Sequence, residues 1–321
     1  MTQVVQVGVE TTPGTTVAAN KKLPSLSMGA SIKANVDKFM PLGSKFPTIH
    51  AQGKEWVEAP ISGAATYSEL PYLLASLLSY AAPVQQGATT AYLWTHAPSS
   101  TAPDTVKTYT VERGSSVRAD KFGYGIVSGL KLAGDRDKID LSGTMLGQTI
   151  TDGITLTASP TAIEQVPILP KEVSIFLDTT SGGLGTTKLT RALKWEFELK
   201  DKIGPAWFVD AAQGSWVAHV ERPVGATFKA MVEADAVGMG LLARLRDGAS
   251  SYVRLKATSA LLAGTAFPYE LTIDMALQVA DVSDFSDEDG VYAIEWTMDL
   301  THDSTWGKAL TASVMNKQTG L

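Results

Sequence analysis

The chain contains no cysteine among its 321 residues. This absence excludes a disulfide framework and a thiolate zinc site, so any metal site would need histidine or carboxylate ligands. The histidines are scattered along the chain and none lies in a known catalytic string. They are His50, His96, His219 and His302. The composition fits a reducing compartment, and we expect neither a metal nor a cofactor.

A strong charge of one sign, a long apolar run and a leader-like N-terminus are also missing. The net charge is -6, with basic and acidic residues mixed, which argues against tight binding to a phosphate backbone but not against DNA passing nearby. The longest charge-poor apolar stretch, Leu70–Val84, is interrupted by Pro71 and too short to span a bilayer. Residues Met1–Gly14 lack a basic segment followed by an apolar one, so we expect a soluble protein that is not exported.

No nucleophile–base set and no phosphate-binding motif stands out. Gly123, Gly125 and Gly129 form G-x-G-x-x-x-G inside a strand pattern, whereas a dinucleotide-binding turn needs G-x-G-x-x-G before a helix. These glycines are therefore expected to allow strand bending or close packing. The glycine-rich segment Ser181–Gly185 lacks the Lys-Ser/Thr of a P-loop. We predict that the protein is not an enzyme.

An acidic run near the C-terminus is the strongest metal candidate. It comprises Asp281, Asp284, Asp287, Glu288 and Asp289, followed by Gly290. Several carboxylates in a loop with a glycine turn suit calcium, but the spacing is not that of an EF-hand. The run lies where a hairpin between two strands is expected, so we predict an exposed acidic hairpin tip. The corresponding turn of the first half, Gly134–Asp137, is far less acidic, which would confine any metal to one half.

The second half of the chain repeats strings of the first. The strings keep their order, and their spacing drifts only as loops of different length would allow. The matched pairs are Ala51–Gly53 with Ala212–Gly214, Trp56 with Trp216, Leu73–Leu77 with Leu241–Leu245, Tyr124–Leu132 with Tyr269–Leu277, and Asp140–Met145 with Ala293–Met298. So long a period indicates a duplicated domain, and the length and 44% apolar content suffice for two domains that each bury a core.

Most of the expected strands alternate apolar and polar residues, which is typical of antiparallel sheets with one buried face. Leucines at helical spacing predict one helix per half, over residues 68–81 and 236–246. We therefore predict a mainly β fold of two tandem antiparallel β-sandwich or barrel domains, each flanked by one helix. The expected parts are an N-terminal arm at 1–24, a first domain at 25–148, a linker at 149–170 and a second domain at 171–321.

Both halves carry aromatic residues in a long loop. Residues 38–53 contain Phe39 and Phe46, and residues 201–214 contain Trp207 and Phe208. These side chains could fold back onto their own domain or meet another subunit, since aromatics are enriched in interface cores. The many strands also imply open sheet edges, which a ring of joined sheets would cover. Assembly is therefore the favoured interpretation.

The chain resembles the tail tube (major tail) proteins of long-tailed bacteriophages. The string Gly8-Val9-Glu10-Thr11-Thr12-Pro13-Gly14-Thr15 is similar to the opening G-x-E-T-x-x-G-T of that family. Further support comes from Tyr109–Gly114, and from Val173–Leu177 followed by Gly185–Thr187. The resemblance covers most of the chain, and its strings are structural rather than catalytic. Most members carry one tube domain, so this chain would be a duplicated-domain form.

The resemblance implies a structural virion protein that self-assembles into stacked rings, which form the conduit for DNA ejection into the host. Duplication suggests that three chains make a pseudo-hexameric ring, with a hexamer of chains as the alternative. The implied partners are other copies of the chain, the tape measure, tail terminator and tail-tip proteins, and double-stranded DNA that passes without specific binding. The implied location is the virion tail, after assembly in the host cytoplasm, with no membrane and no cofactor.

The resemblance also implies roles for particular residues. Ring-stacking residues expected in the two aromatic loops are Phe39, Lys45, Phe46, Pro205, Trp207 and Phe208. Neighbour contacts expected in the N-terminal arm are Glu10, Thr12, Pro13 and Gly14. Acidic residues expected on a lumen wall are Asp274, Glu295 and Asp299, since a basic wall would bind phosphates.

Other classes of function stay open at this point. A tandem β-sandwich binding module for carbohydrate or a host surface would show an exposed aromatic platform and a stable monomer. An enzyme on a β scaffold would need a pocket that gathers His219, Glu221 and nearby acids. Another ring-forming tail protein, such as a terminator or distal adaptor, would form rings that do not polymerise into long tubes.

Overall fold

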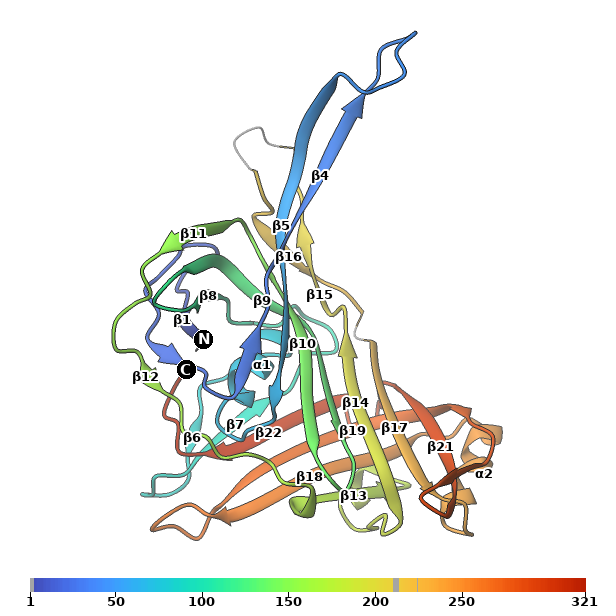
Figure 1. The fold of residues 1–321 in the computed structure, drawn as a ribbon. Coiled ribbons are helices and arrows are strands. Elements are labelled where there is room, and N and C mark those ends of the chain that lie inside the picture. Colours follow the sequence, from blue (N-terminus) through green and yellow to red (C-terminus); the bar gives the residue numbers. More distant parts are fainter. Residues whose placement is uncertain (1–2, 210–213, 224) are drawn as a thin grey trace.

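A computed structural model of the chain describes residues 3–209, 214–223 and 225–321. It is mainly β, with 52% of residues in strands and 8% in helices, which confirms the predicted fold class. One α-helix lies in each described half, as predicted: α1 spans Leu70–Leu77 and α2 spans Leu241–Asp247 (Figure 1). No helix in this part of the chain is long and apolar enough to cross a membrane.

The strands follow one another along the chain as two comparable series. The first half contains β1 Val4–Val9, β2 Lys21–Lys22, β3 Leu26–Met28, β4 Ser31–Phe39, β5 Ile49–Ala64, β6 Val84–Gln85, β7 Tyr92–His96, β8 Tyr109–Gly114, β9 Ala119–Gly134, β10 Ile139–Gly147, β11 Ile150–Ile154 and β12 Thr161–Ala162. The second half contains β13 Val173–Asp178, β14 Ala192–Lys200, β15 Ile203–Ala206, β16 Ala218–Glu221, β17 Gly225–Glu233, β18 Ser251–Leu261, β19 Pro268–Val282, β20 Ser286–Glu288, β21 Val291–Leu300 and β22 Leu310–Asn316. Short 3-10 helices are η1 Pro170–Glu172, η2 Ser181–Gly183 and η3 Gly238–Gly240.

Strands from both halves form one continuous antiparallel layer, here called the long layer. Its first unit has the order β4-β5-β10-β9 and its second unit has the order β14-β17-β21-β19. The units meet where β9 pairs with β14. Figure 1 shows these strands side by side from β5 to β21. Each unit therefore consists of two strands followed by a hairpin, in the same order.

The long strands β9 and β19 belong to two layers. The N-terminal part of β9 pairs with β8 and β11, and that of β19 pairs with β18 and β22. Each strand has a bulge where it runs along the long layer, at Ser128 in β9 and at Ala280 in β19. Because a bulge bends a strand and raises its twist, it lets one strand serve both layers.

The bulges also give the register between the two units. They place Val127, paired with Met145, at the position of Val279, paired with Met298. The match of Asp140–Met145 with Ala293–Met298 agrees with this pairing. The match of Tyr124–Leu132 with Tyr269–Leu277 does not, because similar alternating strings can be aligned in several registers. Strand pairing, not residue similarity, decides the register.

The hydrophobic core runs through both units without a break. Leu132 of β9 and Phe197 of β14 belong to the same cluster of buried residues. A second link joins the halves where β22 pairs with β7, and Trp94 Nε1 there donates a hydrogen bond to Asn316 Oδ1 at 3.0 Å. The halves therefore share a core, whereas the sequence suggested that each would bury its own.

Two segments expected outside the domains are parts of the sheets. The N-terminal arm, 1–24, contains β1, which pairs along β8 and leaves Val5 and Val7 only 2% exposed each. The linker, 149–170, contains β11, which pairs with β9, and β12, which pairs in parallel with β2. The partners of these short strands lie far away in the sequence, so the local pattern alone did not reveal them.

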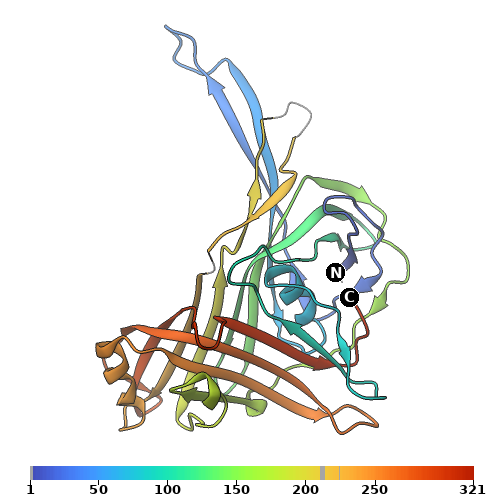
Figure 2. The same cartoon turned by 180° about the vertical axis from the view of Figure 1, so that it is seen from behind.

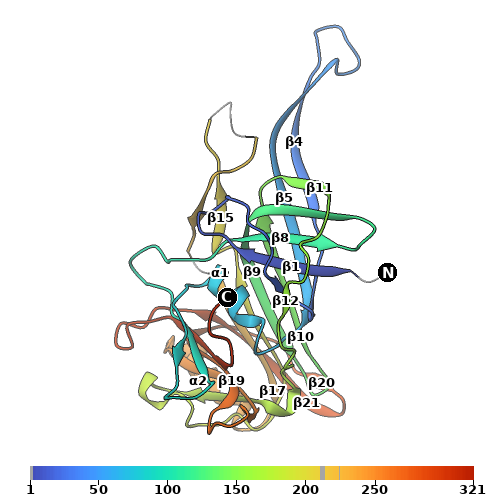
Figure 3. The ribbon, with the colours of Figure 1, turned by 90° about the vertical axis from the view of Figure 1, so that its left-hand side faces the viewer.

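The two aromatic loops are projecting hairpins. β4 and β5 stay paired out to Phe39 and Ile49, so strands replace both ends of the loop expected at 38–53 and leave residues 40–48 between them (Figures 1 and 2). β15 pairs with β16 beside them. β15 lies within the loop expected at 201–214, whereas β16 follows it, and residues 210–213 lie outside the described residues. The repeated string Ala51–Gly53 lies in β5, whereas Ala212 and Gln213 of its match are not described. Figure 3 shows both hairpins pointing away from α2 and β21.

Candidate assembly surface

The junction between β9 and β14 joins one unit of the long layer to the next. Residues 195–199 of β14 pair with residues 130–134 of β9 in antiparallel register. On the core side of the junction, Phe197 and Leu199 are each 1% exposed. Backbone pairing and apolar packing thus act together, which is how an edge strand is protected inside a sheet.

Strand β4 occupies the outer edge of the first unit, where β14 stands in the second. Ile32 of β4 pairs with Val57, and Leu199 of β14 pairs with Ala226, each on the adjacent strand. Within the described residues β4 pairs with β5 alone, so its other edge is open. Ile32 is 57% exposed and Val36 is 44% exposed. A long edge strand with exposed β-branched residues is a template for pairing with another chain.

The opposite edge of the long layer is the C-terminal part of β19. Residues 279–282 pair with β21, while the pairings of β19 with β18 and β22 end before them. In the described part of the chain, this stretch of β19 therefore has one open edge. By the register of the two bulges, these residues correspond to residues 127–130 of β9, of which Leu130 pairs with β14. One chain thus presents two different open edges, at the two ends of the same antiparallel layer.

The surface of the long layer that faces away from the core, here called the polar face, carries charges of both signs. Its charged residues include Lys33, Glu58, Lys131, Asp140, Glu196, Glu198, Lys200, Lys229, Glu295 and Asp299. Several lysines pair with acids: Lys131 Nζ lies 2.6 Å from Glu196 Oε2, and Lys200 Nζ lies 2.7 Å from Glu198 Oε2. Two shallow hollows lie on this face, one beside Glu198 and the other beside Glu295.

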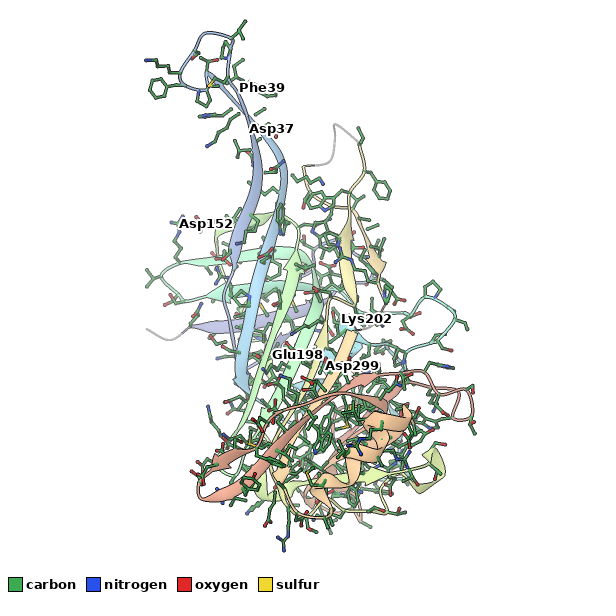
Figure 4. The ribbon with its side chains drawn as sticks, turned by 90° about the vertical axis from the view of Figure 1, so that its right-hand side faces the viewer. Asp37, Phe39, Asp152, Glu198, Lys202 and Asp299 are labelled. Carbon is green, nitrogen blue, oxygen red and sulfur yellow. The ribbon has the colours of Figure 1, made fainter. Side chains whose placement is uncertain are left out.

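The three acids expected on a lumen wall do not lie together. Glu295 and Asp299 lie on β21 and belong to the polar face, and Figure 4 shows Asp299 near Glu198 and far from Phe39 on the projecting hairpin. Asp274 lies on the other part of β19, between β18 and β22, and accepts two hydrogen bonds from Arg254 at 2.6 and 2.8 Å. Asp274 is therefore a partner of Arg254 in the other layer, because β19 joins the long layer only after this position.

Glu10 organises the N-terminal loop from inside. Its carboxylate is buried and accepts hydrogen bonds from Gly14 N and Thr108 Oγ1 at 2.8 Å, from Tyr124 N at 2.9 Å and from Thr110 Oγ1 at 3.0 Å. Gly14 has a φ of +82°, which glycine adopts without strain. Glu10 therefore serves the fold of its own chain and is not available to a neighbour, whereas Gly14 is half-buried and its contact with another subunit stays a prediction.

Thr12 and Pro13 remain exposed on the same loop. The backbone carbonyl of Thr12 accepts a hydrogen bond from Thr15 N at 3.0 Å, which closes the turn below them. These two residues are free to touch a neighbour. Their proposed contact with another subunit stays a prediction.

Asp178 repeats the role of Glu10 in the second half. Its carboxylate accepts hydrogen bonds from Gly185 N at 2.9 Å, Thr186 Oγ1 at 2.7 Å and Thr187 N at 3.0 Å. Burial raises the pKa of Asp178, but the hydrogen bonds from Thr186 and Thr187 outweigh burial and hold the pKa below its usual range. The string Gly-Thr-Thr after a buried acid, present in both halves, was a sequence signal for this turn.

The tip of the β4–β5 hairpin presents its expected stacking residues to solvent. Phe39 is 54% exposed, Phe46 is 75% exposed, and Lys45 is exposed between them along the chain. On the second hairpin, Phe208 is 63% exposed. These four residues are free to contact another molecule, as an assembly surface requires.

Trp207 lies between the hairpins and Pro205 lies within β15, so neither residue is at a tip. The ring of Trp207 meets the ring of Trp56 edge to face at 5.8 Å, and Lys54 Nζ lies 5.1 Å from its centroid. Pro205 is half-buried and pairs with His219 across β15 and β16. Trp207 therefore braces one hairpin against the other, whereas Pro205 pairs within its own hairpin.

No local pattern in the sequence indicates the buried charge below the second hairpin. The side chain of Lys202 is 2% exposed, and its Nζ lies 2.5 Å from the carbonyl oxygen of Leu78, 2.7 Å from Asp104 Oδ2 and 3.7 Å from Glu221 Oε1. The ion pair with Asp104 links the two halves. Lysine in a polar stretch is usually exposed, so only the packing reveals this residue.

His219 and Glu221, named for the enzyme alternative, face different partners. His219 Nδ1 lies 3.1 Å from the hydroxyl of Tyr124, and burial lowers the pKa of His219. The ring of Tyr124 packs against Trp216 at 4.1 Å between centroids. Glu221 accepts a hydrogen bond from Asp104 N at 3.0 Å. These contacts assign structural partners to both residues.

The acidic run forms the hairpin tip that the sequence predicted, between β19, β20 and β21. Asp289 lies 2.8 Å from Arg136, and Glu288 lies 2.6 Å from Lys194. Across residues 3–209, 214–223 and 225–321, no group of three or more histidines and acids is arranged to hold a metal ion. The charges of this hairpin are therefore directed at lysine and arginine or at solvent.

No protein-family model matches this chain, and no curated protein matches it at a significant level. Its function therefore has to be inferred from its own residues and contacts. The features that bear on assembly are the two open edges, the polar face and the projecting hairpins.

Proposed function

We propose that the protein is a structural subunit that joins copies of itself edge to edge into closed rings, which stack into the tail tube of a long-tailed bacteriophage. The observation that carries the proposal is the β9–β14 junction, together with the two open edges of the same kind. At this junction, within one chain, the edge strand of one unit pairs with the edge strand of the next. Resemblance of the N-terminal string to tail tube proteins supports the same function.

The two open edges are complementary in direction. Every neighbouring pair of strands in the long layer is antiparallel, from β4 at one end to β19 at the other. Because each unit contains an even number of strands, β19 of one chain would run antiparallel to β4 of the next. Such a contact joins two different surfaces, and a contact of this kind closes into a ring when its rotation permits.

A trimer of chains is the ring that the duplication favours. If the contact between chains copies the rotation at the β9–β14 junction, successive units are pseudo-equivalent, and three chains give a pseudo-hexamer. A hexamer of chains remains the alternative. End-on images of an assembled ring would decide between them.

The polar face would then line the bore. The other face of the long layer packs against the hydrophobic core, so the polar face is the one that contacts water. The pairing of Lys131 and Lys200 with neighbouring glutamates leaves few unpaired cations for phosphate groups to bind. Glu295 and Asp299 add unpaired acidic charge, which suits a wall along which DNA slides.

Electron microscopy of the purified protein tests the proposal. The protein is concentrated, alone and with a tail-tip initiator complex, and compared with Ile32→Lys, which places a charge on the open edge of β4. We expect hollow tubes with a regular axial repeat for the natural chain and dispersed monomers for Ile32→Lys. The matched control Val117→Lys alters another exposed valine, 81% exposed in the β8–β9 turn, and should assemble normally.

Dispersed particles of the natural chain under every condition would count against the tube. In that case glycan binding would be measured next, since exposed hairpin aromatics also suit a carbohydrate or host-surface module. Tubes formed equally well by Ile32→Lys would contradict the edge-to-edge contact.

A further inference from the structure

The β4–β5 hairpin ends in an apolar surface flanked by positive charge, here called the arm patch. Its apolar residues are Phe39, Met40, Leu42 and Phe46, which are 54%, 60%, 107% and 75% exposed. The hairpin from 37 to 53 contains two lysines, Lys38 and Lys45, and one acidic residue, Asp37. Single exposed apolar residues are common, but a cluster at the tip of a long hairpin marks an interaction site.

A second patch of opposite charge lies on the β19–β21 hairpin, here called the acidic patch. Phe285 and Tyr292 stack at 4.7 Å between centroids with an interplanar angle of 22°, and they are 44% and 60% exposed. Next to them in the hairpin lie Asp284 and Asp287, for which the described residues provide no ion-pair partner within 4.0 Å. The patch therefore combines a preformed aromatic surface with unpaired negative charge.

The two patches lie at opposite ends of the long layer. Strand β5 runs from the arm patch to Ala64, which pairs with Asp140 next to the β9–β10 turn. Arg136 of that turn forms an ion pair with Asp289 in the hairpin of the acidic patch. Figures 1 and 3 show the projecting β4–β5 hairpin and the end of β21 on opposite sides of the molecule.

We propose that the arm patch of one chain docks on the acidic patch of a second copy of the same chain, in the adjacent ring. The occupant is a copy of this chain because each patch supplies what the other lacks: lysines meet aspartates and apolar side chains meet the Phe285–Tyr292 pair. A contact between different surfaces at opposite ends repeats without closing, so it extends a stack along the axis. The proposal rests on the proposed rings and names the surface that receives the stacking hairpin.

Cross-linking in the cysteine-free chain tests the contact directly. The double variant Phe46→Cys/Tyr292→Cys is assembled and treated with a short bismaleimide. We expect a ladder of linked chains from tubes, since each chain would be linked to one above and one below, and no ladder from dispersed protein. The control Phe46→Cys/Val117→Cys carries its second cysteine away from the acidic patch and should give no ladder. Tubes in which this control is linked and the first variant is not would overturn the proposal.

Charge reversal gives a second, independent test. Lys38→Glu/Lys45→Glu and Asp284→Lys/Asp287→Lys should each raise the concentration needed for tubes at least about tenfold, because like charges then face each other. Combining all four substitutions in one chain restores opposite charges and should restore tubes. A combined variant as defective as the worse double variant would overturn the docking.

Different results would contradict the docking of the two patches and the proposed function. The charge variants leave the β4 and β19 edges intact, so isolated rings should still appear by particle size and in end-on images. A natural chain that forms no rings contradicts the proposed function and, with it, the docking. Rings and tubes that form normally in both double variants contradict the docking alone.

Discussion

Strands β14 and β4 occupy the same place in the two units of the long layer, yet one is buried and the other is exposed. Leu199 of β14 is 1% exposed, whereas Ile32 of β4, at the corresponding register position, is 57% exposed. Both residues are large and apolar, so their own chemistry does not explain the difference. The neighbour does: β14 pairs with β9, and β4 has an open edge.

The comparison shows how strongly burial depends on what lies beside a strand. Covering Ile32 as Leu199 is covered would stabilise the assembled edge by roughly 1–2 kcal/mol from apolar area alone. The backbone hydrogen bonds of a new strand pair would add about 1 kcal/mol each. A ring of chains joined at such edges therefore has a physical reason to form without any change in the fold of the subunit.

The largest expected effect is on stability, at the buried member of this pair of residues. Leu199→Asp should lower the free energy of unfolding by about 5 kcal/mol or more, because it removes core packing and buries an unpaired charge. Ile32→Asp, at the corresponding exposed position, should change it by less than about 1 kcal/mol in the monomer. Urea denaturation of both variants at a concentration below assembly measures this. Equal losses would mean that β4 is covered in the isolated chain.

The next largest effect concerns the buried charge of Lys202, at the base of the second hairpin. Lys202→Ala should cost about 3–5 kcal/mol, since it leaves Asp104, whose side chain is 6% exposed, without its partner. Lys200→Ala removes a lysine from the exposed polar face and should have little effect. Thermal unfolding of the two variants provides the measurement. A tolerated Lys202→Ala would show that water replaces the ammonium group.

The second link between the halves predicts a dependence on pH. Burial lowers the pKa of His96, on β7, to about 4, although its Nδ1 lies 2.7 Å from the carbonyl oxygen of Ser79. The unfolded side chain takes up its proton near pH 6.5, so its contribution to stability is present above that pH and is lost as the pH falls towards about 4. The loss should reach roughly 3 kcal/mol at most.

His96→Leu isolates this contribution, because other groups titrate in the same range. The difference in unfolding free energy between the natural chain and His96→Leu should change between pH 7 and pH 4, with the natural chain losing more stability. Chemical denaturation across that range measures the difference. A constant difference would show that His96 is as readily protonated in the folded chain as in the unfolded one.

The smallest expected effect compares an ion pair at the junction with one at the open edge. Lys131 and Glu196 bridge β9 and β14 at 2.6 Å and are 35% and 25% exposed, whereas Lys33 and Glu58 lie 3.7 Å apart and are 46% and 41% exposed. Solvent screens both, so the coupling should be below about 1 kcal/mol for the first pair and near zero for the second. Double-mutant cycles, with methionine for lysine and glutamine for glutamate, measure both couplings. A stronger coupling at the open edge would reverse the expected order.

Local patterns were sufficient for the elements whose stabilising contacts are close in sequence. The alternation of Trp195, Phe197 and Leu199 with charged residues predicted β14, and leucines at helical spacing predicted α1 and α2. The turn residues around Asp289 and Gly290 predicted the acidic hairpin tip. Each of these signals depends on neighbours within a few positions, which a single sequence displays directly.

The functional residues were harder to predict from the sequence, because their roles depend on partners that are distant in the chain. Nothing near Glu10 in the sequence indicates that its carboxylate meets Thr108, Thr110 and Tyr124. The exposed aromatics Phe39 and Phe46 were found, but Trp207 carries the same local signal and lies against Trp56. An aromatic residue in a loop can lie exposed at a hairpin tip or pack between two hairpins. The sequence alone could not distinguish these two placements.

The sequence by itself determined a mainly β chain with a helix in each half and no concentrated positive charge. Only the tertiary structure decided that β9 pairs with β14, that β7 pairs with β22, and that the long layer ends in two open edges. The physical reason is the range of the interactions. Alternation and turn preference act between near neighbours, whereas strand pairing selects among many similar alternating segments by the packing of the whole core.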